Sequence, residues 1–314
     1  MYVYLCSNIE NMISYNLDSI YEIQSSMKEF QLSPEVDSII NTLIEKLGVN
    51  VSRTRVVRKE RPKIQDSQWV RKEPFKASVF EKSEGINECI DGMRGIMNKI
   101  TKNNYETQYE KLVECIDKIW EEEFEDVDDK KKQVCIIDCF MHVVMHNRFY
   151  ADLYAKTFTR LSENYICFDE YRNHFIDKYN ELSTTFTYVN PDEDYDKFCS
   201  INKTNEQRKA LLAFLIYAVS EDVYSFNILR DITLQYFTLI DKQRLDKECV
   251  HMNEEIVENI FVIFSEGKSL ILKEVSRYEL LEKIKELTGF SPGQNPGITN
   301  RIKFKCMDIS DLYK

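Results

Sequence analysis

The sequence predicts an all-α protein, and three observations carry that prediction. Apolar residues recur three or four positions apart over long stretches, as they do on one face of an amphipathic helix. Only 8 glycines and 6 prolines occur in 314 residues, and most of them lie at the ends of these stretches. Hydrophobic residues make up 43% of the chain, which is sufficient for a substantial helical core.

The amino-terminal residues 1–48 are expected to form a short helical extension. Residues 1–32 have the apolar spacing of one or two amphipathic helices. The next helix is better delimited, because Ser33 can cap it, Pro34 suits its first turn and Gly48 ends it. These helices carry too few apolar residues for a core of their own, so we expect them either to bind a partner or to pack on the main domain.

Residues 49–85 are interpreted as an extended, basic linker. Between residues 50 and 72, eight basic residues stand against two acidic ones, so this segment carries a charge of +6 in a chain of net charge −11. Extended basic chain contacts phosphates without reading bases, so single-stranded RNA is the expected ligand. The residues expected to bind it are Arg53, Arg55, Arg58, Lys59, Arg61 and Lys63. A solvated linker without function is the alternative, although the isolated Trp69 is typical of an interface anchor.

Residues 86–314 are predicted to form a series of helix pairs. The first pair has apolar stripes over 86–97 and 105–119, joined by a turn at 98–101. Later apolar series cover residues 134–144, 149–161, 168–179, 211–219, 226–237, 256–264, 280–287 and 302–312, with a polar interruption expected over 187–207. One pair in roughly 35 to 45 residues is typical of a HEAT-type α-solenoid. We therefore predict about five hairpins, each burying its apolar face against the next.

No arrangement of residues in the sequence predicts catalysis. His142 and His146 share a helical face, but Val143 stands where a metallopeptidase needs its general-base glutamate, and a third ligand is missing. The run from Glu121 to Asp129 is interpreted as a solvated acidic loop. The nine cysteines contain no Cys-x-x-Cys pair and are interpreted as buried, reduced thiols. We predict a non-enzymatic protein without cofactor or metal; a hydrolase using the two histidines or the acidic run is the alternative.

Nothing in the sequence has the pattern of a membrane-directed segment. No run of apolar residues approaches the length of a membrane span, and the amino terminus lacks a basic region followed by an apolar one. We therefore expect a cytoplasmic protein with no membrane partner; a nuclear location is the alternative.

Three segments, in the correct order, resemble the middle domain of eukaryotic translation initiation factor 4G. They are CIDGMRGIMNKIT, which ends at Thr101; NRFYADLYAKTF, over residues 147–158; and NRIKFKCMDISDL, over residues 300–312. The first is similar to the family's opening helix and turn, the second to its Asn-Phe-x-x-x-Tyr-Ala stretch, and the third to its closing helix. Related middle domains occur in mRNA decay, nuclear cap-binding and splicing factors, so an adaptor in one of those processes is the alternative function.

The resemblance implies a scaffold that binds a DEAD-box RNA helicase of the initiation factor 4A type. Phe304 matches the family's helicase-contacting aromatic in the closing helix, with Arg301 and Lys303 flanking the contact. Trp69 matches the lead-in tryptophan that docks on the helicase's other lobe. An alternative interpretation makes Phe304 an ordinary core residue of the last helix. The position of its side chain distinguishes the two.

A second partner implied by the resemblance is a cap-binding protein of the initiation factor 4E type. The nearest fit to the family's motif for that protein lies at Tyr15, Ile20 and Tyr21, with an isoleucine where the motif has leucine. A plain amphipathic helix is the alternative interpretation of this segment. Together these expectations describe a scaffold that recruits and stimulates a helicase on capped mRNA.

Overall fold

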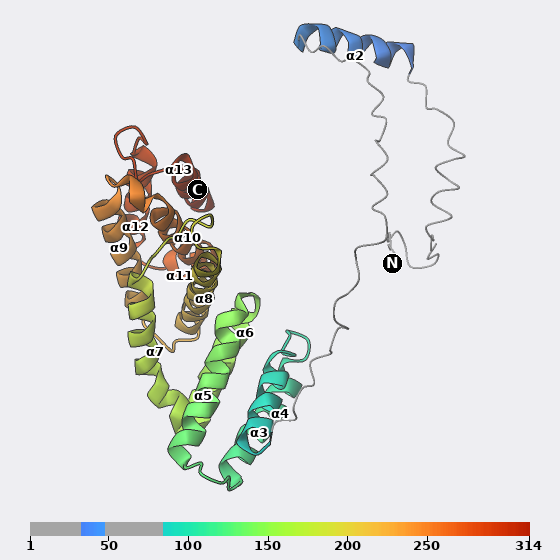
Figure 1. Cartoon of the computed structure of the whole chain (residues 1–314), viewed down its shortest axis with the longest axis vertical. Helices are drawn as coiled ribbons and strands as arrows, with labels where there is room; N and C mark the ends of the chain where they lie inside the picture. Colours follow the sequence, from blue (N-terminus) through green and yellow to red (C-terminus); the bar gives the residue numbers. More distant parts are fainter. Residues whose placement is uncertain (1–32, 48–83) are drawn as a thin grey trace. The chain divides into compact units, whose positions relative to one another are not determined.

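The structure is a computed structural model, and it describes residues 33–47 and 84–314. The chain divides into two units, residues 1–77 and 78–314, which are considered separately. Within the described ranges the chain is helical and contains no β-strand, only an isolated bridge between Phe124 and Val127 (Figure 1). The prediction of an all-α protein is confirmed.

The first unit contains one described helix, α2, over Pro34–Leu47. Its bounds are those predicted from Ser33, Pro34 and Gly48. The amide of Val36 donates to the Ser33 carbonyl at 3.0 Å, which closes the first turn. Apolar side chains on this helix are exposed, with Ile39 at 60% and Leu43 at 52% of their accessible surface.

The second unit is built from helices joined by short connections (Figure 1). The α-helices are α3 Ile86–Met97, α4 Tyr105–Glu121, α5 Asp129–His146, α6 Ala151–Asn164, α7 Ile166–Thr184, α8 Tyr195–Ser220, α9 Phe226–Gln243, α10 Val250–Glu266, α11 Lys268–Ile271, α12 Arg277–Gly289 and α13 Asn300–Leu312. Two 3₁₀ turns, η1 Arg148–Tyr150 and η2 Lys247–Cys249, precede α6 and α10.

Helices α3 and α4 form the hairpin predicted from the apolar spacing. The stripe of α3 is buried, and the turn is held by Asn104, whose Oδ1 accepts from the Thr101 amide at 2.7 Å while its Nδ2 donates to the Lys99 carbonyl at 2.9 Å. A side chain that satisfies two backbone groups fixes the turn without further tertiary contacts.

The helices of the second unit pack in a continuous series. Helix α3 packs on α5, α5 on α8, α8 on α10 and α10 on α13, while α4, α6, α9 and α12 pack against neighbouring members of this series. The core follows the same path. Phe140, Phe158, Phe168, Phe175 and Phe214 are all buried, and their contacting ring centroids lie 5.3 to 5.9 Å apart.

Helix α8 is longer than the sequence pattern predicted. The polar stretch 187–207 was predicted to interrupt the helices, but α8 already begins at Tyr195. The Asp194 side chain caps it, accepting from the Lys197 amide at 2.9 Å. Most residues of this first half are exposed or half-buried, so they show no apolar period, and that part of the prediction was wrong.

Two buried cations each satisfy carbonyl groups at the end of a preceding helix. Lys132 Nζ donates to the carbonyls of Trp120 at 3.1 Å and Glu122 at 2.8 Å, at the end of α4. Arg208 donates to the carbonyls of Leu182 at 3.0 Å and Thr185 at 2.6 Å, at the end of α7. A helix end leaves several carbonyls without intrahelical partners, and these side chains supply donors. The seven carboxylates of the acidic run that precedes Lys132 are exposed, as predicted.

The eight cysteines in the described residues are free thiols, and the prediction that they are buried holds for four of them, while Cys115, Cys135 and Cys249 are half-buried. Cys89, Cys139, Cys167 and Cys306 are buried, and burial raises the pKa of Cys306 to about 12. Cys199 is exposed, which contradicts the prediction for that residue because it lies on the polar half of α8. None of the helices described here combines the length and apolar character needed to cross a membrane.

Candidate functional site

The candidate site is the exposed face of α13, the last helix. Residues Ile302, Cys306 and Ile309 form its buried stripe, at the spacing i, i+4, i+7. Phe304 and Met307 lie off that stripe and are 62% and 50% exposed. The interpretation of Phe304 as a core residue is therefore wrong, and the helix presents two neighbouring large apolar side chains to solvent.

The charges around Phe304 are largely used within the domain. The Arg301 guanidinium lies 3.5 Å from Glu254 Oε2 and 3.2 Å from Glu258 Oε1, both on α10. Lys305 Nζ lies 3.1 Å from Glu258 Oε2. Two cations thus face two carboxylates, so the charges of Arg301 and Lys305 are balanced within the domain. Lys303 is half-buried and forms no ion pair among the described residues.

The start of α13 is held by a connection that only glycine fits. The Gly297 amide donates to the Arg244 carbonyl of α9's end at 2.9 Å, and its carbonyl accepts from Asn253 Nδ2 of α10 at 3.0 Å. A Cβ at Gly297 would lie 2.7 Å from the Asp246 carbonyl oxygen. Thr299 then caps α13, accepting from the Ile302 amide at 3.3 Å. Phe304 is therefore presented from a fixed helix.

The other predicted binding residues cannot be compared with the structure. Trp69, the RNA-binding residues Arg53, Arg55, Arg58, Lys59, Arg61 and Lys63, and the cap-protein contacts Tyr15, Ile20 and Tyr21 lie outside the described residues. Their roles remain predictions.

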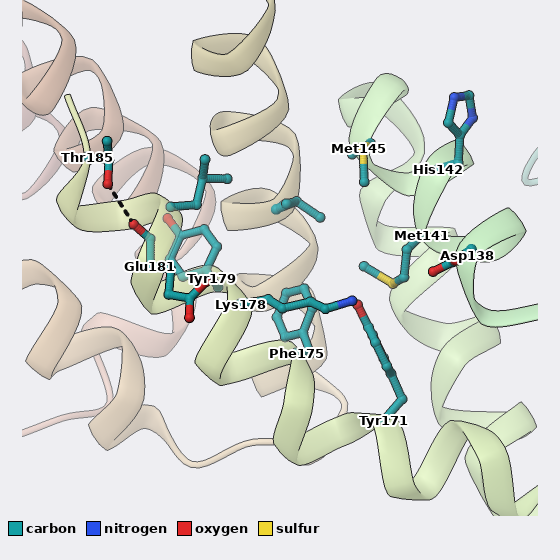
Figure 2. Close-up of a pocket in the computed structure, with 12 residues that line it drawn as sticks. Asp138, Met141, His142, Met145, Tyr171, Phe175, Lys178, Tyr179, Glu181 and Thr185 are labelled. Atoms are coloured by element: carbon teal, nitrogen blue, oxygen red, sulfur yellow. Dashed lines mark hydrogen bonds between the residues drawn. The ribbon is translucent and has the colours of Figure 1, made fainter. Parts of the chain in front are cut away.

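The two histidines considered for metal binding have other contacts. Their ring centroids are 4.4 Å apart, but His146 Nδ1 lies 2.7 Å from the His142 carbonyl and its Nε2 lies 3.0 Å from Gln207 Nε2. In residues 33–47 and 84–314 no three His, Cys, Asp or Glu side chains are grouped as metal ligands. His142 instead lies at the edge of a pocket between α5 and α7 (Figure 2).

Sequence reasoning missed the partners that hold this face together. Glu254 and Glu258 are four residues apart on α10, a spacing that places both on one helical face. That spacing was a usable signal, but their pairing with α13 depends on tertiary packing. Met307 could have been recognised as exposed, since a stripe through 302, 306 and 309 excludes it.

Comparison with models of known protein families gives no match to this chain, and comparison with curated proteins gives none either.

Proposed function

We propose that this chain is a non-enzymatic scaffold of translation initiation that binds a DEAD-box RNA helicase of the initiation factor 4A type. The observation that carries the proposal is the 62% exposure of Phe304, in the segment that resembles the closing helix of the initiation factor 4G middle domain. Aromatic residues, phenylalanine included, are enriched at protein–protein interfaces relative to the rest of the surface.

We also propose that the second unit is a HEAT-type α-solenoid. The support is the order of its contacts, α3 on α5, α5 on α8, α8 on α10 and α10 on α13, because each member packs mainly on its neighbours. Such an arrangement offers an extended surface, which suits a protein that holds another protein.

The proposal extends to a cap-binding protein and to mRNA through residues that precede α3. Residues 1–48 would contact the cap-binding protein, and the basic segment within residues 49–85 would contact single-stranded RNA. These parts rest on the sequence alone.

The test is the substitution Phe304→Ala in the full chain. An exposed anchor should contribute about 2 to 4 kcal/mol to helicase binding, so we expect roughly 30-fold to several hundred-fold weaker affinity. The fold should be retained because the side chain adds little to the core. The same variant should fail to stimulate the helicase's RNA-dependent ATPase, because a scaffold acts only through its preference for the productive arrangement of the helicase.

The matched control is Ile166→Ala, which truncates an apolar side chain that is 73% exposed at the start of α7. Equal loss of affinity in both variants, or none in Phe304→Ala, would reject the anchor role. Binding to a helicase of mRNA decay or splicing in preference to initiation factor 4A would favour the alternative adaptor function.

A further inference from the structure

A groove of about 630 Å³ lies between α5 and α7, with Leu211 of α8 at its base. Helix α5 contributes Asp138, Met141, His142 and Met145; helix α7 contributes Tyr171, Phe175, Lys178, Tyr179, Glu181 and Leu182, followed by Thr185. Figure 2 shows Met141 and Phe175 pointing into the space between the two helices. Among these residues, only His142 was singled out by the sequence, and the proposed helicase contact on α13 does not include any of them.

The groove has the residue spacing of two facing helical surfaces. On α5 the lining residues follow i, i+3, i+4, i+7 from Asp138, and on α7 they include Tyr171, Phe175 and Leu182 at i, i+4 and i+11. One stripe of each helix therefore faces a common channel.

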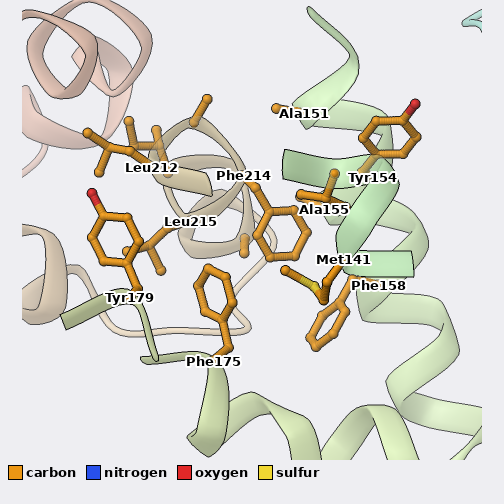
Figure 3. Packing of buried hydrophobic residues seen from close by; sticks show 14 of the residues in the cluster. Met141, Ala151, Tyr154, Ala155, Phe158, Phe175, Tyr179, Leu212, Phe214 and Leu215 are labelled. Carbon is orange, nitrogen blue, oxygen red and sulfur yellow. The ribbon is translucent and has the colours of Figure 1, made fainter. Parts of the chain in front are cut away.

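The floor of the groove is continuous with the core. Met141, Phe175 and Tyr179 are buried, and Phe175 packs on Phe214 with ring centroids 5.3 Å apart. Figure 3 shows these residues among the buried cluster. The floor is therefore rigid apolar surface.

Above the floor lies a second tier of apolar side chains that the domain covers only in part. Met145, Tyr171, Leu182 and Leu211 are half-buried. These side chains would lose further apolar surface if another chain covered them, and methionine adapts readily to the shape of a partner.

The rim of the groove carries unpaired carboxylates. Asp138 on α5 and Glu181 on α7 are exposed, and neither carboxylate has a hydrogen bond or ion pair with another described residue. Lys178 Nζ lies over the Tyr171 ring, 5.3 Å from its centroid. Burial, His146 and the nearby cations Arg94 and Lys203 lower the pKa of His142, which favours its neutral form. Among the residues that line the groove, two carboxylates on opposite walls and one ammonium give a net negative charge.

We infer that this groove binds an amphipathic helix of a partner protein, with apolar side chains on the groove floor and Lys or Arg side chains facing Asp138 and Glu181. The cavity has room for a few large side chains of one helix, not for a folded domain, and helices recognised in grooves use anchors at i, i+3, i+4 and i+7. The negative rim selects a basic partner helix over an acidic one. This site is independent of the proposed helicase contact at Phe304.

The experiment measures binding of a synthetic helical peptide of about 15 residues to the full chain. The peptide carries Leu at i, i+3, i+4 and i+7, Lys on the flanking positions and Ala elsewhere. Its controls are a scrambled peptide of the same composition and a peptide with Glu in place of Lys. Methyl NMR of labelled methionines locates the site, because Met141 and Met145 line the groove while Met307 lies on α13.

We expect micromolar binding of the Leu/Lys peptide, with methyl shifts at Met141 and Met145 and none at Met307. The double variant Asp138→Lys/Glu181→Lys should bind the peptide about tenfold more weakly. The matched control Asp177→Lys changes an exposed carboxylate elsewhere on α7 and should bind normally. Thermal unfolding should be unchanged in these variants, since all three positions are exposed.

Several results would overturn the inference. These are absence of binding, equal binding of the scrambled or Glu peptide, an equal loss with Asp177→Lys, or shifts confined to Met307. Binding of small apolar molecules in the groove without binding of the peptide would likewise exclude a helix as the occupant.

Discussion

Lys132 and Arg208 perform the same task in two different surroundings. Each donates to two main-chain carbonyls near the end of the preceding helix. Lys132 lies under an exposed acidic loop, with the Asp129 carboxylate 3.9 Å away. Arg208 is only 1% exposed, forms no ion pair within the described chain and stacks on the Phe186 ring at 4.2 Å.

The comparison indicates that the stability contributed by a cation at a helix end depends on whether water can take over its hydrogen bonds after a substitution. Around Lys132, water and exposed carboxylates are close, so its carbonyls can be hydrated after a substitution. Around Arg208, the Phe186 ring and the buried Tyr179 and Tyr236 surround the guanidinium, so an apolar replacement would lose three hydrogen bonds at a site that water reaches poorly. Burial lowers the pKa of Arg208, yet the guanidinium remains charged at neutral pH.

The largest expected effect is that of Arg208→Met. Two carbonyls and the Asn205 side chain, which accepts from Nη1 at 2.7 Å, would lose their donor. Since each acceptor left without a donor costs about 1 to 3 kcal/mol, we expect a loss of roughly 3 to 5 kcal/mol in the free energy of unfolding, measured by urea denaturation. The control Lys203→Met removes an exposed cation from the same helix and should change stability by less than about 0.5 kcal/mol. Comparable losses in the two variants would contradict the assigned role of Arg208.

A smaller effect is expected for Lys132→Met. Two hydrogen bonds are lost under an exposed acidic loop, and a loss of about 1 to 2 kcal/mol should result because water can take the place of the ammonium. Lys130→Met serves as the control, since Lys130 is an exposed residue of the same turn. If Lys132→Met were as damaging as Arg208→Met, exposure of the surroundings would not explain the comparison.

The smallest effect at neutral pH is expected for the double variant Tyr179→Phe/Tyr236→Phe. The two hydroxyls share one buried hydrogen bond of 3.0 Å beside Arg208. Removing both together leaves no hydroxyl unpaired, so the change should stay within about 1 kcal/mol, whereas either single variant should cost more. A double variant less stable than both single variants would be inconsistent with a mutually satisfied pair.

The pH dependence of the free energy of unfolding tests how deeply the surroundings of Arg208 are buried. Burial raises the pKa of Tyr236 to about 12 and that of Tyr179 well above its usual value. The folded chain therefore keeps these protons at a pH where the unfolded chain has lost them, so stability is full below about pH 10 and falls as pH rises further. The slope of unfolding free energy should be shallower in the double Phe variant, by up to about 1.4 kcal/mol per pH unit for each tyrosine. Equal slopes in the two proteins would show that neither hydroxyl keeps its proton in the folded chain above about pH 10.

Helical periodicity predicted the elements whose buried stripe is regular. The apolar stripe through Ile86, Ile90 and Met93 predicted α3. Ser33 and Pro34 predicted where α2 begins. Periodicity failed for the first half of α8, because that half buries too little surface to require apolar residues. It also could not identify Arg208 as a core residue, because arginine in a sequence is typical of a solvated surface.

The candidate site was predicted in part for similar reasons. The position of Phe304 came from a family resemblance, while its exposure depends on which stripe of α13 is buried. The neutralisation of Arg301 by Glu254 and Glu258 joins two helices distant in sequence, and local spacing does not encode it. The groove between α5 and α7 was missed because its walls look like ordinary amphipathic helices until both are placed on α8.

The Gly297 connection has a mechanical consequence. Its amide and carbonyl are bonded to the end of α9 and to Asn253 of α10, so the start of α13 is tied to two helices besides its hairpin partner α12. A force applied at Phe304 is consequently distributed over α9, α10 and α12. These contacts oppose an outward rotation of α13 about the Gly297 connection. Movement of a protein bound at Phe304 would therefore displace the carboxyl-terminal helices together, because α13 is mechanically coupled to them.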